Sequence, residues 1–352
     1  MTGAAKAVVV AGRGGKLPVA FICLALLILF ILYSVTIGRY GLTVPDVAAI
    51  LFDNIVPNAN PGWTDVQASV VEMVRLPRIL AAVLVGFGLS VSGAALQGLF
   101  RNPLVDPGIV GVTAGAGFGG TLAILLDING AGLLALSFLC GIGSVIVVRA
   151  LATVKGRTSI LTLVLAGVVV SAFFEAAISI AKLLADPHQK LPAITYWLMG
   201  SLASTSYWDL LLLGIAIIPA ALVIYLLRFQ INIVSLGEDK ARALGSPVAL
   251  VQWTVLVATA CISAGVVATS GMIGWVGLIV PHVARVLVGA DHRRLLPVAG
   301  LLGGIYMLGV DNVARTASVA EIPIGIITAL VGVPVFAVIL RRVHSKGGWR
   351  DD

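Results

Sequence analysis

Runs of apolar residues recur along almost the whole of this chain, and this repetition limits its fold more than any other feature. A helix needs roughly 20 such residues to cross a bilayer, and in lipid every backbone polar group must be satisfied within the protein. Hydrophobic residues make up 59% of the 352 residues and charged residues only 11%, against about 25% charged in soluble domains. This composition excludes a soluble enzyme, a disordered scaffold, a collagen and a disulfide-rich secreted module. We expect an all-α polytopic membrane protein.

The hydropathy pattern predicts ten transmembrane helices within one membrane domain, residues 17–344. The expected spans are Leu17–Ile37, Ile79–Phe100, Gly108–Leu126, Ala131–Leu151, Ser159–Ala185, Tyr207–Leu227, Leu250–Thr269, Ile273–Val288, Leu295–Ala314 and Ile324–Leu340. Residues 38–74, which contain Pro45, Pro57 and Pro61, are expected to form a loop outside the membrane. An even number of spans places the two tails, residues 1–16 and 345–352, on one side.

The distribution of basic residues orients this topology. The net charge is +7, but no basic residues cluster with aromatic residues on a polar module, so nucleic acid is not an expected partner. Loops that stay in the cytoplasm carry an excess of Lys and Arg. With both termini in the cytoplasm, most of the 23 basic residues lie inside. Those left outside are Arg39, Arg75, Arg78, Lys182, Lys190 and Arg315.

Glycine is frequent inside the predicted spans, often at small-xxx-small spacing. Residues 115–120 satisfy the dinucleotide pattern G-x-G-x-x-G, but they follow no strand and lie within an apolar run. Small residues let helices in lipid approach closely, so we interpret this pattern as helix packing. The sequence G-x-x-x-x-G-K-[ST] is absent, because Gly15-Lys16 is followed by Leu17. The chain is therefore not expected to bind ATP in a phosphate loop.

Candidate catalytic and metal-binding groups are sparse. His188, His282, His292 and His344 lie far apart, without the i, i+4 spacing of a metal site. The three cysteines, Cys23, Cys140 and Cys261, each lie in an apolar run, where a thiol is most often a small buried side chain. No nucleophile-elbow pattern with serine occurs. We expect no catalytic site, no metal site and no cofactor bound by this chain.

Polar motifs occur instead at the predicted membrane edges. In chain order they are RLPR (residues 75–78), GAALQGLFRNPLVDPG (93–108), GEDKARALG (237–245), GWVGLIVPHVAR (274–285), DHRRLLP (291–297), DNVAR (311–315) and EIPIG (321–325). As an ordered set covering residues 70–340, they resemble the FecCD family of ABC importer permeases, which carries ferric siderophores, haem and vitamin B12.

The resemblance implies a transport subunit of the inner membrane that is not itself an enzyme. It implies ten helices per subunit, a homodimer with the path on its axis, two cytoplasmic ATPase subunits that hold ATP and Mg²⁺, and a periplasmic substrate-binding protein. Transport would proceed by alternating access, with the ATPase subunits rocking the two permease copies.

Three arginines are the docking residues that the resemblance implies. Arg75 and Arg78 precede the second span and Arg315 ends the ninth, so we expect all three to reach the outer aqueous face and pair with glutamates of the binding protein. From position alone, the alternative is that they only anchor helix ends.

The turn after the second span is the expected cytoplasmic gate. Asn102-Pro103 cannot continue a helix, because proline restricts the residue before it and lacks a donor. The resemblance places Asn102 and Leu104 at the inner gate, with Thr158 and Ser159 before the fifth span. The alternative is a helix stop with no part in gating.

The polar segment between spans six and seven, residues 228–249, is the expected cytoplasmic coupling segment. It is too polar to cross lipid, and its motif contributes Gly237, Glu238, Ala241, Arg242 and Gly245. We expect residues 237–245 of this segment to form the short helices that dock on the ATPase subunit. The alternative is a solvated cytoplasmic turn.

The cargo is the least constrained prediction. We favour an iron-containing chelate, first haem, because the path-forming spans offer few charges; a ferric siderophore is the alternative, and cobalamin is less favoured. A different class, an ion-coupled secondary transporter, normally places ionisable residues near the midplane. Only Glu175 and Asp311 are acids well inside spans, and Asp311 stands four residues before Arg315, as in an ordinary helix pair.

Overall fold

The computed structural model describes residues 17–345, apart from residues 39, 54–61, 155–156 and 159. The helices that correspond to the ten predicted spans are α1 (Leu17–Thr36), α4 (Leu76–Leu99), α5 (Val112–Leu125), α6 (Ala131–Ala152), α7 (Ile160–Leu184), α9 (Tyr207–Leu226), α12 (Val248–Ser270), α13 (Val276–Val288), α14 (His292–Thr316) and α15 (Ile324–Ser345). Within the described residues, seven helical segments are long and apolar enough to cross a membrane, whereas α5, α13 and α15 contain shorter apolar segments. The prediction of an all-α polytopic fold is confirmed.

Short elements connect these helices. They are α2 (Val44–Asp53), α3 (Asp65–Ser69), the π-helix η1 (Val70–Arg75), the 3₁₀ helix η2 (Pro107–Val110), the antiparallel strands β1 (Thr153–Val154) and β2 (Arg157–Thr158), α8 (Lys190–Leu198), α10 (Arg228–Val234) and α11 (Glu238–Ala243). The sequence predicted short helical structure at α11, within residues 237–245, but it did not predict α2, α3, α8, α10 or the strand pair.

The prediction of a loop over residues 38–74 is wrong for the last part of this range. α3, η1 and α4 form one continuous helix, Asp65–Leu99, so Pro77 lies inside a helix rather than in its first turn. Proline has no N–H and its ring crowds the carbonyl four residues earlier. The wider π turn directly before Pro77 relieves this crowding, and the backbone N–H of Leu76 bonds to Val71 O.

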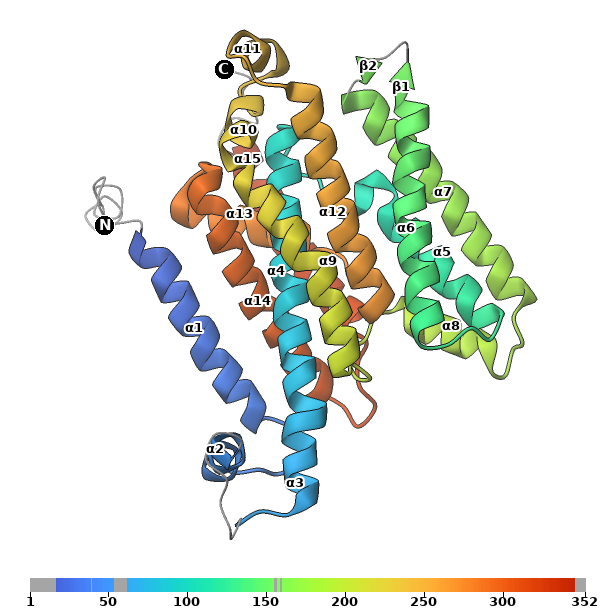
Figure 1. Ribbon diagram of the computed structural model, residues 1–352, viewed down its shortest axis with the longest axis vertical. Coiled ribbons are helices and arrows are strands. Elements are labelled where there is room, and N and C mark those ends of the chain that lie inside the picture. The colour runs from blue at the N-terminus through green and yellow to red at the C-terminus, as the bar shows by residue number, and fades with distance from the viewer. Residues whose placement is uncertain (1–16, 39, 54–61, 155–156, 159, 346–352) are drawn as a thin grey trace.

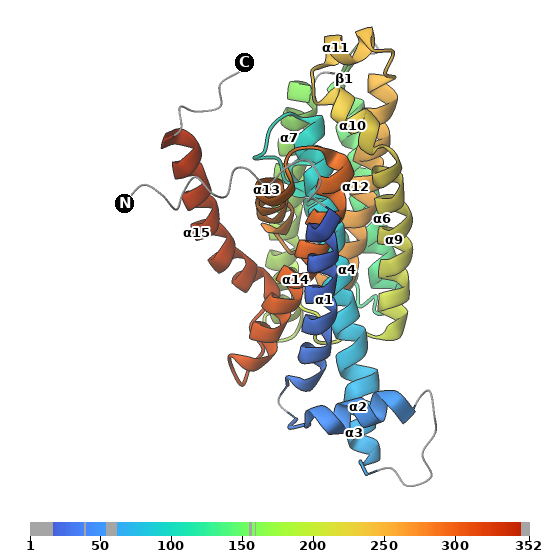
Figure 2. The same ribbon diagram turned by 90° about the vertical axis from the view of Figure 1, so that its left-hand side faces the viewer.

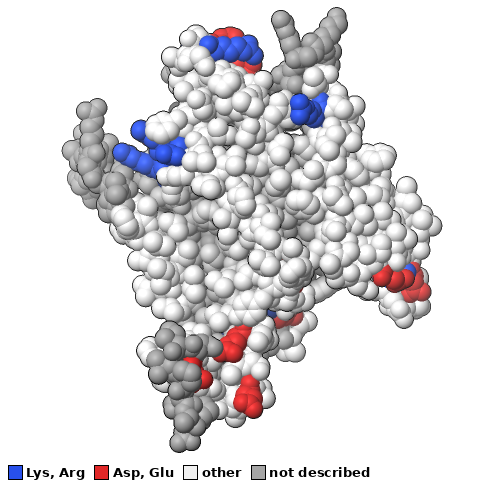
Figure 3. Space-filling model, viewed as in Figure 1, with Lys and Arg blue, Asp and Glu red and all other residues white. Residues whose placement is uncertain are grey.

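The two ends of the bundle differ in charge. α2 and α3 lie at one end, and α10, α11 and the β1–β2 pair lie at the other (Figure 1). Basic side chains gather at the end with α10 and α11, and acidic ones at the end with α2 and α3 (Figure 3). Loops that stay in the cytoplasm carry an excess of Lys and Arg, so we call the basic end the inner end and the opposite one the outer end. α1 begins and α15 finishes on the inner side (Figures 1 and 2), as predicted for cytoplasmic termini.

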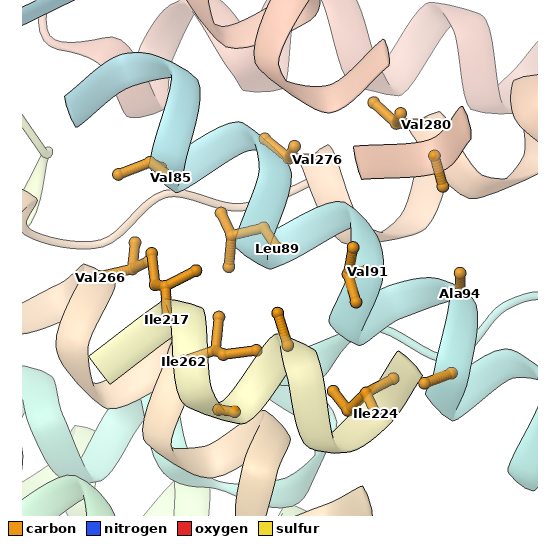
Figure 4. Packing of buried hydrophobic residues seen from close by; sticks show 14 of the residues in the cluster. Val85, Leu89, Val91, Ala94, Ile217, Ile224, Ile262, Val266, Val276 and Val280 are labelled. Carbon is orange, nitrogen blue, oxygen red and sulfur yellow. The ribbon is translucent and has the colours of Figure 1, made fainter. Parts of the chain in front are cut away.

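α4 lies at the centre of the bundle, surrounded by α9, α12, α13 and α14. Leu89 of α4 lies among Val276 of α13, Ile217 of α9 and Ile262 of α12 (Figure 4). Burial of such side chains within a protein interior sets the packing of the neighbouring helices.

Glycine allows the closest contacts of α4. A Cβ added at Gly86 would overlap the carbonyl oxygen of Gly303 on α14, and one at Gly93 would overlap that of Gly277 on α13. The pattern at residues 115–120 has the same purpose: it lies within α5, and Gly115 and Gly119 face α6. The interpretation of this pattern as helix packing is confirmed.

Candidate functional site

The outer ends of α1, α4 and α14 meet around three buried arginines. Arg75 is 4% exposed and donates from Nη1 to Val35 O and from Nη2 to Tyr40 O, both at 2.6 Å. These carbonyls lie at and beyond the last turn of α1, where the backbone has no helical donors left. Arg75 therefore caps the C-terminal end of α1.

Arg78 joins α4 to α14. Its Nε donates to Asp311 Oδ1 at 2.7 Å, and its guanidinium forms a two-point ion pair with Glu321, at 3.0 Å in each contact. The side chains of Arg78 and Asp311 are 6% and 0% exposed. An arginine fork matches a carboxylate in two parallel bonds, so Arg78 fixes both α14 and the segment that follows it.

Arg315 completes the cluster from α14. It donates from Nη2 to Ser34 O at 2.7 Å and from Nη1 to Ile37 O at 2.9 Å, and it also contacts Asn312 Oδ1. The expected pairing with Asp311 is present, with Nε 3.6 Å from Oδ2, but Arg78 is the nearer partner of that acid. Asp311 is thus held between two arginines.

The expectation that these arginines face water is wrong in this structure. Arg75, Arg78 and Arg315 are 4%, 5% and 5% exposed, because α1 carbonyls and the acids Asp311 and Glu321 take up their donors. Their positions agree with the alternative reading, in which they anchor helix ends. Docking of a binding protein through them stays a prediction.

The inner end of α4 leads into the predicted gate turn. Arg101 takes a left-handed conformation, φ +51°, that side chains rarely adopt. Asn102 Oδ1 then accepts from the backbone N–H of Leu104 at 2.9 Å, and both side chains are exposed. Thr158 lies in β2 and pairs through its backbone with Thr153, whereas Ser159 lies outside the described residues. The predicted turn is present, but its gating role stays a prediction.

Gln97, in the last turn of α4, is a buried polar residue that the sequence did not single out. It is 3% exposed, and its amide Nε2 donates at 3.2 Å to the carbonyls of Gly277 and Leu278 on α13 and at 3.4 Å to Val105 O. Its Oε1 accepts from Arg285 Nη2 at 3.0 Å. A glutamine within an apolar stretch was the sequence signal that could have identified this residue, because a polar side chain inside a span needs hydrogen-bond partners. Gln97 ties α13 to the chain just beyond the gate turn.

A second inner contact connects α10 with α14. His292 is 3% exposed, and its Nδ1 lies 2.7 Å from Asn232 Oδ1 while its Nε2 lies 3.3 Å from Ala94 O. Asp291 caps α14, and hydrogen bonds from Arg293 hold the pKa of this carboxyl below its ordinary value. The coupling segment is therefore attached to α4 through α14.

The coupling segment itself turns sharply at two glycines. Gly237 and Gly245 have φ values of +111° and +78°, which glycine adopts at little cost. Glu238 forms an ion pair with Arg242 at 2.8 Å and accepts from Gln252 Nε2 of α12 at 3.1 Å. Ala241 is fully buried, so its expected part in docking is indirect.

The exposed surface of this segment is partly apolar. Leu236 is 55% exposed and Leu244 is 63% exposed. They lie on either side of α11, at the inner end of the molecule. Docking of this segment on an ATPase subunit stays a prediction, as does the alternative of a solvated turn.

The structure also has a cavity away from the two ends of the bundle. A cavity of about 830 Å³ lies between α6, α9 and α12, lined by apolar side chains such as Leu134, Ile215 and Val257; its lining suits lipid chains. Among the described residues, no group of His, Cys, Asp or Glu could hold a metal ion.

The fold and its two ends define a polytopic membrane protein with a basic inner end and an acidic outer end. Residues 26–342 match the model of the FecCD transport family. The chain belongs to this family.

Relatives of this chain are named for different cargoes. The molybdate import system permease protein MolB of Haemophilus influenzae is 44% identical over 92% of this chain and 95% of its own. The hemin transport system permease protein HmuU of Yersinia pestis is 39% identical over 78% and 84%. A solved structure described as an inward-facing conformation of a putative metal-chelate type ABC transporter has a TM-score of 0.83 and 43% identity, covering 92% of this chain and 99% of that one.

The pair Arg78–Asp311 should contribute strongly to stability. Arg78→Gln leaves the buried Asp311 carboxylate without its nearer partner, and breaking a buried pair in this way costs about 3–5 kcal/mol. The double variant Arg78→Gln with Asp311→Asn should recover part of the loss. Thermal unfolding of the purified protein in detergent measures this.

Lys190→Gln is the matched control for this experiment. It breaks the partly exposed pair Lys190–Asp127, whose side chains are 28% and 74% exposed, and the hydrogen bond of Lys190 Nζ to Leu125 O, and should cost about 1 kcal/mol. An equal loss in Arg78→Gln and Lys190→Gln would contradict the structural role of the buried pair.

Proposed function

We propose that this chain is the permease subunit of an ABC importer of the inner membrane, in which two copies form the translocation path. Two ATPase subunits bind the inner end, and a periplasmic binding protein delivers cargo to the outer end. The observation that carries the proposal is the exposed coupling segment at the inner end of a FecCD fold, attached through His292 and Asn232 to the helices that carry the gate turn.

ATP and Mg²⁺ bind to the partner subunits in this proposal, because this sequence lacks a phosphate-loop motif. The energy of ATP must then reach the permease through surface contact. α11, with Leu236 and Leu244 exposed beside it, offers such a contact. The hydrogen bonds of Asn232 and His292 would pass its displacement to α14 and α4.

A second copy of the chain accounts for the exposure of α15. This helix diverges from the rest of the bundle (Figure 2), and Leu330 and Val338 are 70% and 53% exposed. Helices in lipid associate through close packing rather than hydrophobic drive. We therefore propose a homodimer in which apolar faces of the two copies pack together around a common path.

The outer arginines support the docking surface in this proposal. Arg75 and Arg315 fix the end of α1, and Arg78 fixes Glu321 in the segment after α14. The binding protein would meet the surface that these contacts hold in place. This assigns Arg75, Arg78 and Arg315 a positioning role in docking.

Transport would proceed by alternating access. ATP binding and hydrolysis on the partners shift the population between inward-open and outward-open states. Gln97 is placed to move the gate turn together with α13, since it bonds to Gly277, Leu278 and Val105. An ion-coupled mechanism is not needed, because Asp311 is held by Arg78 and Arg315.

Two cargoes are supported by different observations. The relative named for molybdate is 44% identical across 92% of this chain, compared with 39% across 78% for the relative named for hemin. We propose a molybdenum oxyanion as the first candidate for this reason. Haem, expected from the low charge of the spans, is the second candidate, ahead of ferric siderophores and cobalamin.

Uptake by the reconstituted complex tests the cargo. Proteoliposomes with the permease, its ATPase and its binding protein should accumulate labelled molybdate when ATP is enclosed, and should accumulate less haem, ferric siderophore or cobalamin. Complex without the ATPase is the control. Uptake of haem in preference to molybdate would reverse the order, and ATP-independent uptake would contradict the ABC mechanism.

Coupling to the ATPase should depend on the exposed leucine of the segment. Leu244→Ser should lower ATP-driven uptake at least about tenfold, because a central interface contact is lost, while the protein stays folded. Leu151→Ser is the control: Leu151 is 52% exposed on α6, away from the segment. Equal uptake in both variants would support the solvated turn. A bulky residue at Ala241 would not test docking, because it would overpack a buried position.

The gate should close through the turn at Asn102 and Leu104. Single cysteines at 102 or 104, in a background without Cys23, Cys140 and Cys261, should crosslink to the second copy when the inner gate is shut. Opening the gate with nucleotide and binding protein should suppress the crosslink. Cysteine at Val105, which is 2% exposed, is the control and should not react. Failure to crosslink in every state would leave only a helix stop.

A further inference from the structure

The cavity between α6, α9 and α12 is a groove that opens on the side of the bundle. α12 lies between the other two helices and contacts both of them (Figure 1). It contributes the small residues Ala258, Cys261 and Gly265 to the lining, so the groove is deepest over α12. Ile215 of α9 and Val257 of α12 also line it and are 61% and 49% exposed. The groove is therefore open to whatever surrounds the spans.

The groove is long and carries no charge in its lining. Along α12 it extends from Trp253 to Thr269, about 24 Å at 1.5 Å per residue, and along α9 from Trp208 to Val223, about 22 Å. One leaflet of a bilayer provides about 15 Å of hydrocarbon, half of a core about 30 Å thick. An apolar groove of this length suits an acyl chain rather than a polar solute.

A basic side chain lies at the inner mouth of the groove. Arg149 is in the last turn of α6, and its guanidinium carbon lies 4.7 Å from the centre of the Trp253 ring, which belongs to the lining. Arg149 is exposed, and none of the ion pairs found among the described residues involves it. The ring holds the face of the guanidinium beside the groove and leaves its N–H edge for an anion.

We propose that this groove binds an anionic phospholipid of the inner leaflet, with one acyl chain along α12 and the phosphate on Arg149. The cytoplasmic leaflet carries anionic lipids, and arginine forms charge-assisted hydrogen bonds with phosphate. At the opposite mouth the lining ends at Trp208 and Thr269 and contains no cation, so the headgroup belongs at the inner mouth. Such a site requires neither cargo nor ATPase subunits and is separate from the proposed transport function.

Lipid retained by the purified chain tests the role of Arg149. Full-length protein, extracted in mild detergent from membranes of phosphatidylglycerol and phosphatidylethanolamine, should keep a single phosphatidylglycerol per chain by native mass spectrometry. Arg149→Gln should lower this occupancy at least about fivefold, because a charge-assisted contact is lost, and Arg149→Lys should keep part of it. Arg341→Gln is the matched control, since Arg341 is an exposed basic residue of α15 that does not line the groove. Equal retention by Arg149→Gln and Arg341→Gln would overturn the proposal.

Chemical labelling of a native cysteine tests the position of the acyl chain. Cys261 lines the groove and Cys140 of α6 does not, so two proteins are compared that each keep only one of these thiols. Because a covered thiol reacts slowly, N-ethylmaleimide should modify Cys261 at least about fivefold more slowly with phosphatidylglycerol than with phosphatidylcholine. Cys140 should react equally with both lipids.

Inorganic phosphate distinguishes a lipid from a free anion. It has no acyl chain and should leave Cys261 unprotected, and Arg149→Gln should abolish the difference between the two lipids. Protection of Cys261 by inorganic phosphate, or equal labelling with both lipids in the unaltered sequence, would contradict the proposal.

Filling the groove separates its shape from its charge. Cys261→Phe keeps Arg149 but occupies the space over α12, so it should lower retention of phosphatidylglycerol as Arg149→Gln does. Leu222→Phe is the control, because Leu222 is 55% exposed on α9 but does not line the groove. Loss of retention in Arg149→Gln but not in Cys261→Phe would place the lipid on the surface and exclude the groove.

Discussion

The close backbone contact of α4 with α13 and α14 is the constraint on which the rest of the structure depends. Gly86 and Gly93 leave no room for a side chain against Gly303 and Gly277. In lipid there is little hydrophobic drive between helices, so contacts at this range supply much of the packing energy. The 24 residues of α4 form a buried rod, about 36 Å long at 1.5 Å per residue.

Both functional ends of the molecule are attached to this rod. Arg78, in its first turn, holds Asp311 and Glu321 at the outer end. Gln97, in its last turn, holds α13 and the chain beyond the gate turn at the inner end. A displacement of α4 relative to α13 and α14 would thus change contacts at both ends, as the proposed alternating access requires. Small shifts between packed helices switch between discrete arrangements, because such cores do not deform continuously.

The sequence was sufficient for the spans, but not for the contacts of polar side chains. Apolar length and the positive-inside rule depend on local composition, so α1, α4 and the other spans could be drawn from the pattern. The burial of Arg78 depends on Asp311, 233 residues later, and a single sequence does not show that distance in space. The π turn before Pro77 and the hairpin of β1 and β2 likewise depend on how the chain is packed.

The polar groups inside the spans separate into two kinds. Gln97 and Asp311 are buried, and each is satisfied by carbonyls or arginines of neighbouring helices. Contacts within the chain hold such groups in one arrangement. Glu175 is exposed on the surface of α7 at membrane depth, where lipid offers no hydration. The energy of a folded monomer in lipid therefore does not explain the exposure of Glu175. This exposure is explained where water or a second copy of the chain replaces lipid beside the side chain.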